Sequence, residues 1–194
     1  MICAFIPKQI KYTGAQLAAL WAYRNFGIQG DSLVAFVGPC RIPTRLMIDA
    51  EDVRAGSKIF SARMLHFIAE HFDGDLETAV LRQRLLAVIV KDELEQHLDY
   101  RLTRRGDDLY DPVVKNKPAK LSISIATASP VSTLIHFAIN IDSKHTPVIA
   151  AGLNDYSAKG KINPEEFANK VMRAYVAEMH SIRQARQKVF PAHQ

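Results

Sequence analysis

The chain has few of the residues that mark a disulfide-stabilised or membrane-spanning protein. Its 194 residues include two cysteines, Cys3 and Cys40, which argues against a disulfide framework or a cysteine-based zinc site. The longest aliphatic run, residues 85–90, is far shorter than the roughly 20 residues that span a bilayer. Met1 leads into a short apolar segment without a small-residue cleavage site. We therefore expect no signal peptide, no membrane contact and a cytoplasmic protein.

Sequence motifs of several common enzyme classes are absent as well. There is no GxGxxG after a strand, no Walker-type P-loop, no GxSxG elbow and no HExxH. His66 and His71 are five residues apart, which is not the spacing of a helical zinc pair. These absences weigh against dinucleotide-binding, P-loop and common hydrolase classes.

The composition is that of a globular protein. Hydrophobic residues make up 48% of the chain and charged residues 23%, and no internal repeat or linker interrupts it. We expect a single domain over residues 1–194. The net charge of +5 is compatible with an anionic ligand or a nucleic acid and requires neither.

The predicted elements are mixed in order and do not alternate strand with helix. Apolar periodicity and capping residues predict strands at 2–6, 33–37, 46–48, 100–102, 108–110 and 148–151, and helices at 13–25, 57–72, 75–97 and 163–188. Asn163 is a good cap for the last helix, and Pro164 suits its first turn. This order predicts an α+β fold: a mixed, largely antiparallel sheet with helices on one face.

Residues 120–142 are the most informative stretch. Two runs alternate apolar and polar residues on either side of Ser129-Pro130, which predicts a β-hairpin with a loop at 128–132. Pairing Thr127 with Thr133 puts Lys120 opposite Asn140 and Ser124 opposite His136. One face is then apolar, and the other is polar with small residues in its middle, which leaves room for a ligand pocket. The alternative is an ordinary solvated face.

Four kinds of side chain on that polar face are candidates for the site. Lys120 is the candidate catalytic residue, because an ammonium can hold a carboxylate or phosphate and stabilise negative charge in acyl transfer. Asn140 is expected to orient Lys120 or a ligand carbonyl, and His136 to bond Ser124 or act as an acid or base. Ser122 and Ser124 are expected to shape the pocket. The alternatives are a solvent-facing lysine and a satisfied, partly buried histidine.

Other residues support weaker hypotheses, each with a plainer alternative. Cys40 follows Gly38-Pro39 at a strand end, where it would be an exposed nucleophile or ligand-binding residue, or else a small buried hydrophobe. Residues 104–108 would be a phosphate clasp or a tight turn. Asp49, Glu51 and Asp52 would bind magnesium or form an acidic surface loop. Basic residues of the last helix would contact RNA or solvent; they are Lys170, Arg173, Arg183, Arg186 and Lys188.

The whole chain resembles a bacterial and archaeal family of domains of unknown function. The resemblance is carried by residues 30–40, 64–68, 106–108 and 120–142. Members of that family are similar to the biotin/lipoate protein ligase fold. In those ligases a strand opens Lys-Leu/Ile-x-x-Ile and a later one ends Gly-Ile-Asn; here Lys120-Leu121-Ser122-Ile123 and Ala138-Ile139-Asn140 are similar.

This resemblance implies that Lys120 contacts an acyl carboxylate or an adenylate phosphate, with Asn140 nearby. It leaves ATP with Mg²⁺ open as cofactors. The ligases' Gly/Arg-rich adenylate loop has no good counterpart in this chain.

The leading hypothesis is a ligase-like pocket for a small carboxylate, acyl or nucleotide-like ligand, with acyl or adenylyl transfer as the reaction. One alternative is a binding module without catalysis, and a second is an RNA-binding protein. We expect a small-molecule partner rather than nucleic acid, and leave a homodimer open.

Overall fold

A five-stranded mixed sheet forms the centre of the protein. The computed structural model describes residues 1–144, 146–156 and 160–190. The strand order is β1 (Ile2–Ile6), β2 (Ser32–Arg41), β3 (Phe60–His71), β8 (Thr133–Asp142) and β7 (Ser122–Ala128). β1 and β2 are parallel, and every other neighbouring pair is antiparallel. The predicted α+β class with a largely antiparallel sheet is confirmed.

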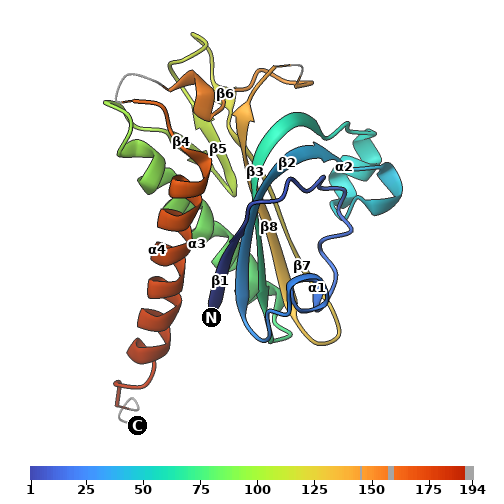
Figure 1. Ribbon diagram of the computed structural model, residues 1–194, viewed down its shortest axis with the longest axis vertical. Helices are drawn as coiled ribbons and strands as arrows, with labels where there is room; N and C mark the ends of the chain where they lie inside the picture. The colour runs from blue at the N-terminus through green and yellow to red at the C-terminus, as the bar shows by residue number, and fades with distance from the viewer. Residues whose placement is uncertain (145, 157–159, 191–194) are drawn as a thin grey trace.

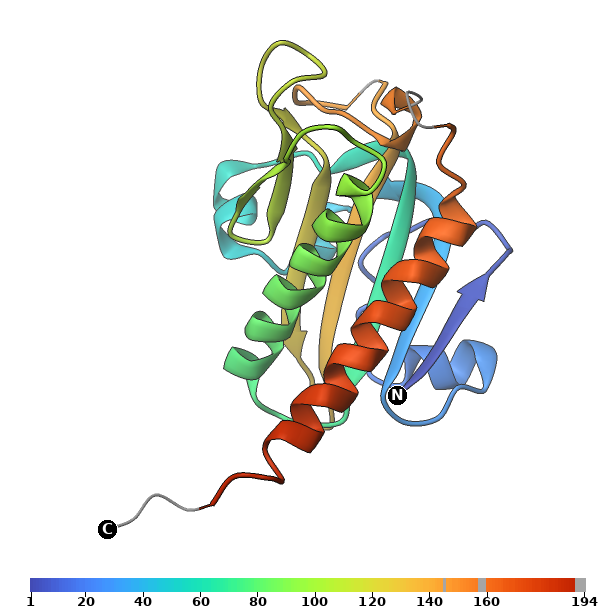
Figure 2. The same ribbon diagram turned by 90° about the vertical axis from the view of Figure 1, so that its left-hand side faces the viewer.

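Two long helices cover one face of this sheet. They are α3 (Leu76–Glu95) and α4 (Pro164–Ala185), which lie side by side across the strands (Figures 1 and 2). Two short helices, α1 (Trp21–Phe26) and α2 (Ala50–Ala55), lie on the other side (Figure 1). Two 3₁₀ turns, η1 (Thr44–Leu46) and η2 (Leu153–Asp155), complete the helical elements in the described ranges. The face opposite α3 and α4 is therefore only partly covered.

A small antiparallel sheet extends one end of the central sheet. It consists of β4 (Thr103–Arg105), β5 (Asp108–Asp111) and β6 (Ala119–Lys120), in that order. β6 leads into β7 after one residue, and Lys120 also bridges to Ala150. This arrangement brings the start of β5 and the start of β7 together.

The apolar residues form two clusters, one on each side of the central sheet. The larger lies under α3 and α4 and includes Phe67, Phe137 and Tyr175. The smaller lies on the opposite side and includes Tyr12 and Phe36. Burial of large aromatic side chains on both faces is worth several kilocalories per mole and fixes the sheet between its two layers.

Both long helices begin where the sequence predicts. Asp75 and Asn163 have extended backbones, and each side chain accepts hydrogen bonds from the backbone N–H groups two and three residues on. These contacts satisfy donors that have no partner within the helix. The buried stripe of α4 includes Phe167, Val171 and Tyr175, whereas Ile182 near its end is exposed.

The predicted helix at 57–72 is wrong, because this segment is the central strand β3. β3 has neighbours on both sides, and its second half, from Met64 to His71, is buried on both faces. A strand buried on both faces lacks the polar–apolar alternation that identifies an amphipathic strand. Its residues therefore match a helical pattern equally well.

Two shorter predictions are also wrong in part. The helix predicted at 13–25 is present only from Trp21 to Phe26, and Gly27 ends it in the left-handed conformation. The strand predicted at 46–48 is replaced by η1 and α2, whose cap is Asp49. Asp49 accepts from the N–H groups of Glu51 and Asp52, so it acts as a helix cap.

The predicted hairpin exists, but its register is wrong by one residue. Ala128 pairs with Thr133, so Ser124 lies opposite Phe137 and Ile125 opposite His136. The turn closes one residue tighter than expected, because Ser129 bonds Ser132 through both its backbone and its hydroxyl. A one-residue slip exchanges the faces of a strand. Thus the isoleucines of β7, rather than its serines, share a face with His136 and Asn140.

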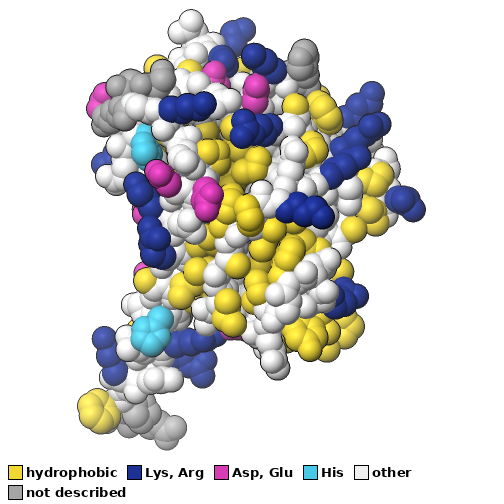
Figure 3. All heavy atoms as spheres, in the orientation of Figure 1, with side chains coloured by type: hydrophobic (Ala, Val, Ile, Leu, Met, Phe, Trp, Pro, Cys, Tyr) yellow, Lys and Arg dark blue, Asp and Glu magenta, His cyan; other side chains and the backbone are white. Residues whose placement is uncertain are grey.

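The surface beside α4 shows hydrophobic side chains gathered near the centre of the view, where β1 lies (Figure 3). β1 is an edge strand, and half of Ile2 is exposed.

No helix within the described ranges is long and apolar enough to cross a membrane.

Candidate functional site

A cavity of about 470 Å³ lies on the face of the sheet opposite α3 and α4. Its floor comes from β3, β7 and β8, and its walls come from the η1–α2 segment, the start of β5 and residues 146–150. Its apolar lining includes Leu17, Ile42, Leu46, Met64, Ile123 and Val148. Both the size and the mixture of apolar and polar groups are typical of small-molecule sites.

Lys120 stands at the polar end of this cavity. Its Nζ lies 2.8 Å from Oδ2 of Asp108, and its side chain is 30% exposed. Lys120 thus borders the cavity, and it has an acidic partner that the hairpin pattern did not predict. Burial raises the pKa of Asp108, and the hydrogen bond from Lys120 opposes that rise. Asp108 thus holds a negative charge at some cost in free energy.

Asn140 holds the backbone around Lys120. Its Oδ1 accepts from Oγ of Ser61 at 2.9 Å, and its Nδ2 donates to the carbonyl oxygens of Ala151 at 3.2 Å and Lys120 at 3.4 Å. These bonds use both ends of the amide, so Asn140 positions Lys120 through its main chain. Of the two roles expected for Asn140, orienting Lys120 is the one these contacts support.

His136 lies in the floor of the cavity and contacts a second histidine. Its Nε2 is 3.1 Å from Nδ1 of His66, and Nε2 of His66 is 3.1 Å from the carbonyl oxygen of Gly38. The ring of Tyr12 stacks on His136 with centroids 3.7 Å apart. Burial lowers the pKa of His66 to about 4 and that of His136 well below its ordinary value. Both rings are therefore neutral at neutral pH.

Tyr12 and Asp108 line the cavity and His66 contacts His136, although the hairpin pattern predicts none of the three there. His66 was assigned to a helix, in which its relation to His136 is invisible. Read as a strand, the five-residue separation of His66 and His71 puts them on opposite faces. His71 indeed faces α4, where its Nε2 lies 2.9 Å from the hydroxyl of Tyr175.

The hydroxyls of Ser122 and Ser124 are engaged on the helix side of β7, contrary to the predicted register. Oγ of Ser122 accepts from the backbone N–H of Leu109. Oγ of Ser124 donates to the carbonyl oxygen of His136 and accepts from Nε2 of Gln83 on α3. Both residues border the cavity, but these hydroxyls are already bonded within the protein.

Cys40 is buried in the smaller apolar cluster and is absent from the lining of the cavity. Burial raises the pKa of its thiol to about 12, so the thiolate that a nucleophile requires is strongly disfavoured. The expectation of an exposed Cys40 is therefore wrong, and the residue packs as a small hydrophobe.

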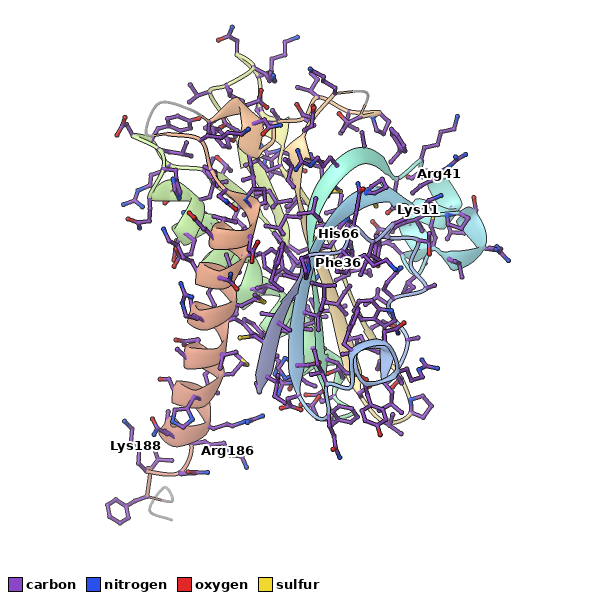
Figure 4. The ribbon with its side chains drawn as sticks, viewed as in Figure 1. Lys11, Phe36, Arg41, His66, Arg186 and Lys188 are labelled. Atoms are coloured by element: carbon purple, nitrogen blue, oxygen red, sulfur yellow. The ribbon has the colours of Figure 1, made fainter. Side chains whose placement is uncertain are left out.

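A second cleft of about 820 Å³ adjoins the first and is lined by three cations, Lys11, Arg41 and Lys58. No carboxylate lines it among the described residues, and Ile59 and Phe60 belong to both cavities. Lys11 and Arg41 lie near α2, whereas Arg186 and Lys188 lie at the remote end of α4 (Figure 4). The basic end of α4 is thus separate from the cavity.

No group of three or more histidine, cysteine, aspartate or glutamate side chains suited to a metal ion occurs in the part of the chain described. Residues 104–108 form the tight turn between β4 and β5 rather than an open clasp. Asp107 there bonds Gln83 and Arg84 of α3.

A mixed sheet with two helices on one face and a ligand-sized cavity on the other is the biotin/lipoate protein ligase-like fold. Biotin protein ligase from Aquifex aeolicus in complex with biotin and ATP superposes with a TM-score of 0.60 at 13% identity, covering 94% of this chain and 72% of that one. A putative lipoate protein ligase from Thermoplasma acidophilum with bound lipoic acid gives 0.57 at 14% identity, covering 93% and 87%. These likenesses establish the fold.

The chain belongs to the family described as domain of unknown function DUF366, whose model matches residues 1–190. An uncharacterised protein of Methanocaldococcus jannaschii is 36% identical over 203 residues, covering 98% of this chain and 85% of that protein. A solved protein of unknown function from Pyrococcus horikoshi is 36% identical and covers all of both chains with a TM-score of 0.88. The predicted resemblance is thereby confirmed.

Proposed function

We propose that the cavity binds a small carboxylate, acyl or nucleotide-like ligand, with Lys120 as the anchor for its anionic group. The observation that carries this proposal is the position of Lys120 Nζ at the polar end of a largely apolar cavity. An ammonium has three N–H donors, and Asp108 is its one ion-pair partner among the described residues. Donors therefore remain for a ligand oxygen.

The rest of the cavity suits an acyl chain. Met64, Ile123 and Leu17 provide an apolar lining. Polar groups border the cavity both around Lys120 and Asn140 and on the segment of residues 49–58. A ligand with a hydrocarbon body and one anionic end would bury its chain on the sheet and leave its charge at Lys120. Transfer of each methylene from water contributes about 0.8 kcal/mol.

The neighbouring cationic cleft supports the nucleotide-like form of this proposal. Lys11, Arg41 and Lys58 would face the phosphates of a ligand that extends from one cavity into the other. The Aquifex ligase of the same fold is described with biotin and ATP, and the Thermoplasma protein with lipoic acid. The corresponding reaction here is adenylyl transfer: a carboxylate oxygen attacks the α-phosphorus of ATP, and the bond to the β-phosphate breaks to release pyrophosphate.

Calorimetric titration with octanoate, lipoate and biotin tests the binding. Lys120→Ala is expected to weaken the bound carboxylate at least about tenfold, because it removes the counter-charge. Lys117→Ala is the matched control, since Lys117 is an exposed lysine a few residues away and lies outside the cavity lining. Absence of binding by every compound, or equal affinity of Lys120→Ala and the parent protein, would contradict the proposal.

Exchange of pyrophosphate into ATP in the presence of the bound carboxylate separates the two forms of the function. Exchange that disappears in Lys120→Ala identifies a transferase. Carboxylate binding without exchange identifies a module that holds the ligand without activating it. Arg41→Ala is expected to weaken ATP and leave octanoate unaffected, because Arg41 lines only the second cleft.

A further inference from the structure

The buried histidine pair lies between two neighbouring strands in the floor of the cavity. His66 is on β3 and His136 on β8, and both are almost completely buried. Tyr12 covers His136 at an interplanar angle of 12°, and Phe36 stacks on His66 (Figure 4 shows Phe36 beside His66). The rings are therefore held in fixed orientations, and their hydrogen bonds have fixed directions.

The direction of these bonds follows from one atom that can only accept. The carbonyl oxygen of Gly38 lies 3.1 Å from Nε2 of His66, so this nitrogen carries the proton. Because burial keeps His66 neutral, its Nδ1 has a lone pair and accepts from Nε2–H of His136 at 3.1 Å. His136 is neutral too, so its own Nδ1 has no proton and is an acceptor.

This last nitrogen has no partner within the protein. Nδ1 of His136 makes no hydrogen bond to any described residue, although the residue is 1% exposed and lines the cavity. Among the described side chains, Ser32 Oγ is the one polar atom that is both fully enclosed and without a hydrogen-bond partner. Nδ1 of His136 has no partner among them either, so it is not fully enclosed. Because His136 lines the cavity, this nitrogen is open to the cavity. It is a neutral acceptor that a ligand can reach.

We infer that the cavity selects a ligand whose buried end carries a neutral N–H or O–H donor for Nδ1 of His136, and whose other end is the anion at Lys120. This rests on the proposed function and adds the chemistry of the ligand's second end. A plain hydrocarbon end would cover Nδ1 without bonding it, and a buried unpaired acceptor is unfavourable. A cationic end is excluded by the same burial that keeps both histidines neutral.

The strand geometry sets the length of such a ligand. Asn140, which holds Lys120, is four residues along β8 from His136, and a strand rises by about 3.3 Å per residue. The backbones of these two residues are therefore roughly 13 Å apart along β8. A chain of about eight carbons spans most of this distance.

Four carboxylates of equal chain length test the inference by calorimetry on the full chain. They are octanoate, ω-hydroxyoctanoate, the monoamide of octanedioic acid, and the methyl-ketone analogue, which can only accept. The hydroxyl and amide compounds are expected to bind at least about tenfold more tightly than octanoate and the ketone, because only they can donate to Nδ1. Equal affinity for all four would overturn the inference and leave the proposed function intact. Failure of all four to bind would overturn both.

Two variants test the assignment of the acceptor. His136→Phe keeps an aromatic ring under Tyr12 and is expected to abolish the preference, so that the four compounds bind with equal affinity. His66→Phe removes the acceptor that fixes the tautomer of His136, so Nδ1 of His136 can carry the proton and donate. The affinity for the ketone is therefore expected to rise relative to that for the hydroxyl compound. Nitrogen-15 spectra of the parent protein provide a check without substitution: Nδ1 of His136 should be unprotonated and should shift when the amide binds. A protonated Nδ1 would refute the inference.

Discussion

At the scale of single residues, the polar end of the cavity depends on competition for one ammonium group. Asp108 holds Lys120 at 2.8 Å, and its own charge is disfavoured by burial and by Asp107, which raise its pKa. A carboxylate ligand bound at Lys120 would add a further negative charge beside Asp108. The pKa of Asp108 then rises further, so binding of the carboxylate ligand favours uptake of a proton by Asp108.

Asp108→Asn is accordingly expected to strengthen octanoate binding about tenfold, because it removes both the competitor and the repulsion. In the parent protein, affinity should rise as pH falls toward the pKa of Asp108, and this dependence should vanish in the variant. Asp92→Asn makes the same charge change on an outward-facing part of α3 and is the control. Titration calorimetry at several pH values measures both effects; unchanged affinity in Asp108→Asn would place the anion elsewhere.

Residues alone account for part of the site. Asn140 and His136 are four residues apart on β8, so their shared face follows from local alternation. Lys120 alternates in sequence with Ser122 and Ser124, so its place at the cavity does not. Tyr12 and His66 lie outside the hairpin of β7 and β8 and approach His136 only because distant segments pack against β8. The local sequence pattern around His136 cannot predict its contacts with residues that are distant in the chain.

At the scale of elements, β2 controls how the segment before α1 approaches the cavity. The backbone of Ile10 and Tyr12 bonds Val37, Pro39 and Arg41 of β2, next to a register irregularity between Gly38 and Cys40. A Cβ on Gly38 would lie 1.8 Å from the carbonyl oxygen of Ile10. Glycine is required here because only it permits this approach.

Gly38→Ala should therefore displace the segment that carries Tyr12 and lower the free energy of unfolding by more than about 2 kcal/mol. Gly74→Ala is the matched control, because no atom lies within 4 Å of the added carbon. Urea unfolding followed by the fluorescence of Trp21 measures both. Equal midpoints for the two variants would show that the segment does not pack against Gly38 in solution.

The elements differ in how far their sequences predict them. α3 and α4 are long, have good caps and are free of glycine and proline in their interiors, so local propensity and packing agree. β3 is a strand because β2 and β8 pair with both its edges. The register of β7 depends on the turn between Ser129 and Ser132. This turn pairs Ala128 with Thr133, whereas the sequence pattern predicts a pair between Thr127 and Thr133.

At the scale of the whole molecule, three histidines are buried in neutral form across both layers. Burial lowers the pKa of His66 and His71 from 6.5 to about 4, with the charge of Arg82 adding to the effect at His71, and lowers that of His136 strongly. The unfolded chain binds protons at His66 and His71 below about pH 6.5, whereas the folded protein does so only near pH 4. Stability is therefore lost as pH falls through this interval.

The expected loss is about 3 kcal/mol for one histidine displaced this far, at about 1.4 kcal/mol per pH unit. His71→Gln should flatten the dependence, because glutamine does not titrate and can still bond Tyr175. His180→Gln, a change at an exposed histidine, should not flatten it. Urea denaturation between neutral pH and pH 4 provides the measurement; identical slopes for His71→Gln and the parent would contradict burial of a neutral His71.

The sequence by itself determined the α+β class, the two capped helices, and the face of β8 that presents His136 and Asn140, because each depends on neighbours within a few residues. Only the tertiary structure decided that residues 60–71 form a strand, that β7 turns its serines toward α3, and that Tyr12 and Asp108 line the cavity while His66 contacts His136. Those outcomes depend on pairing between segments far apart in the chain. The free energy of such pairing is not present in any short stretch of residues.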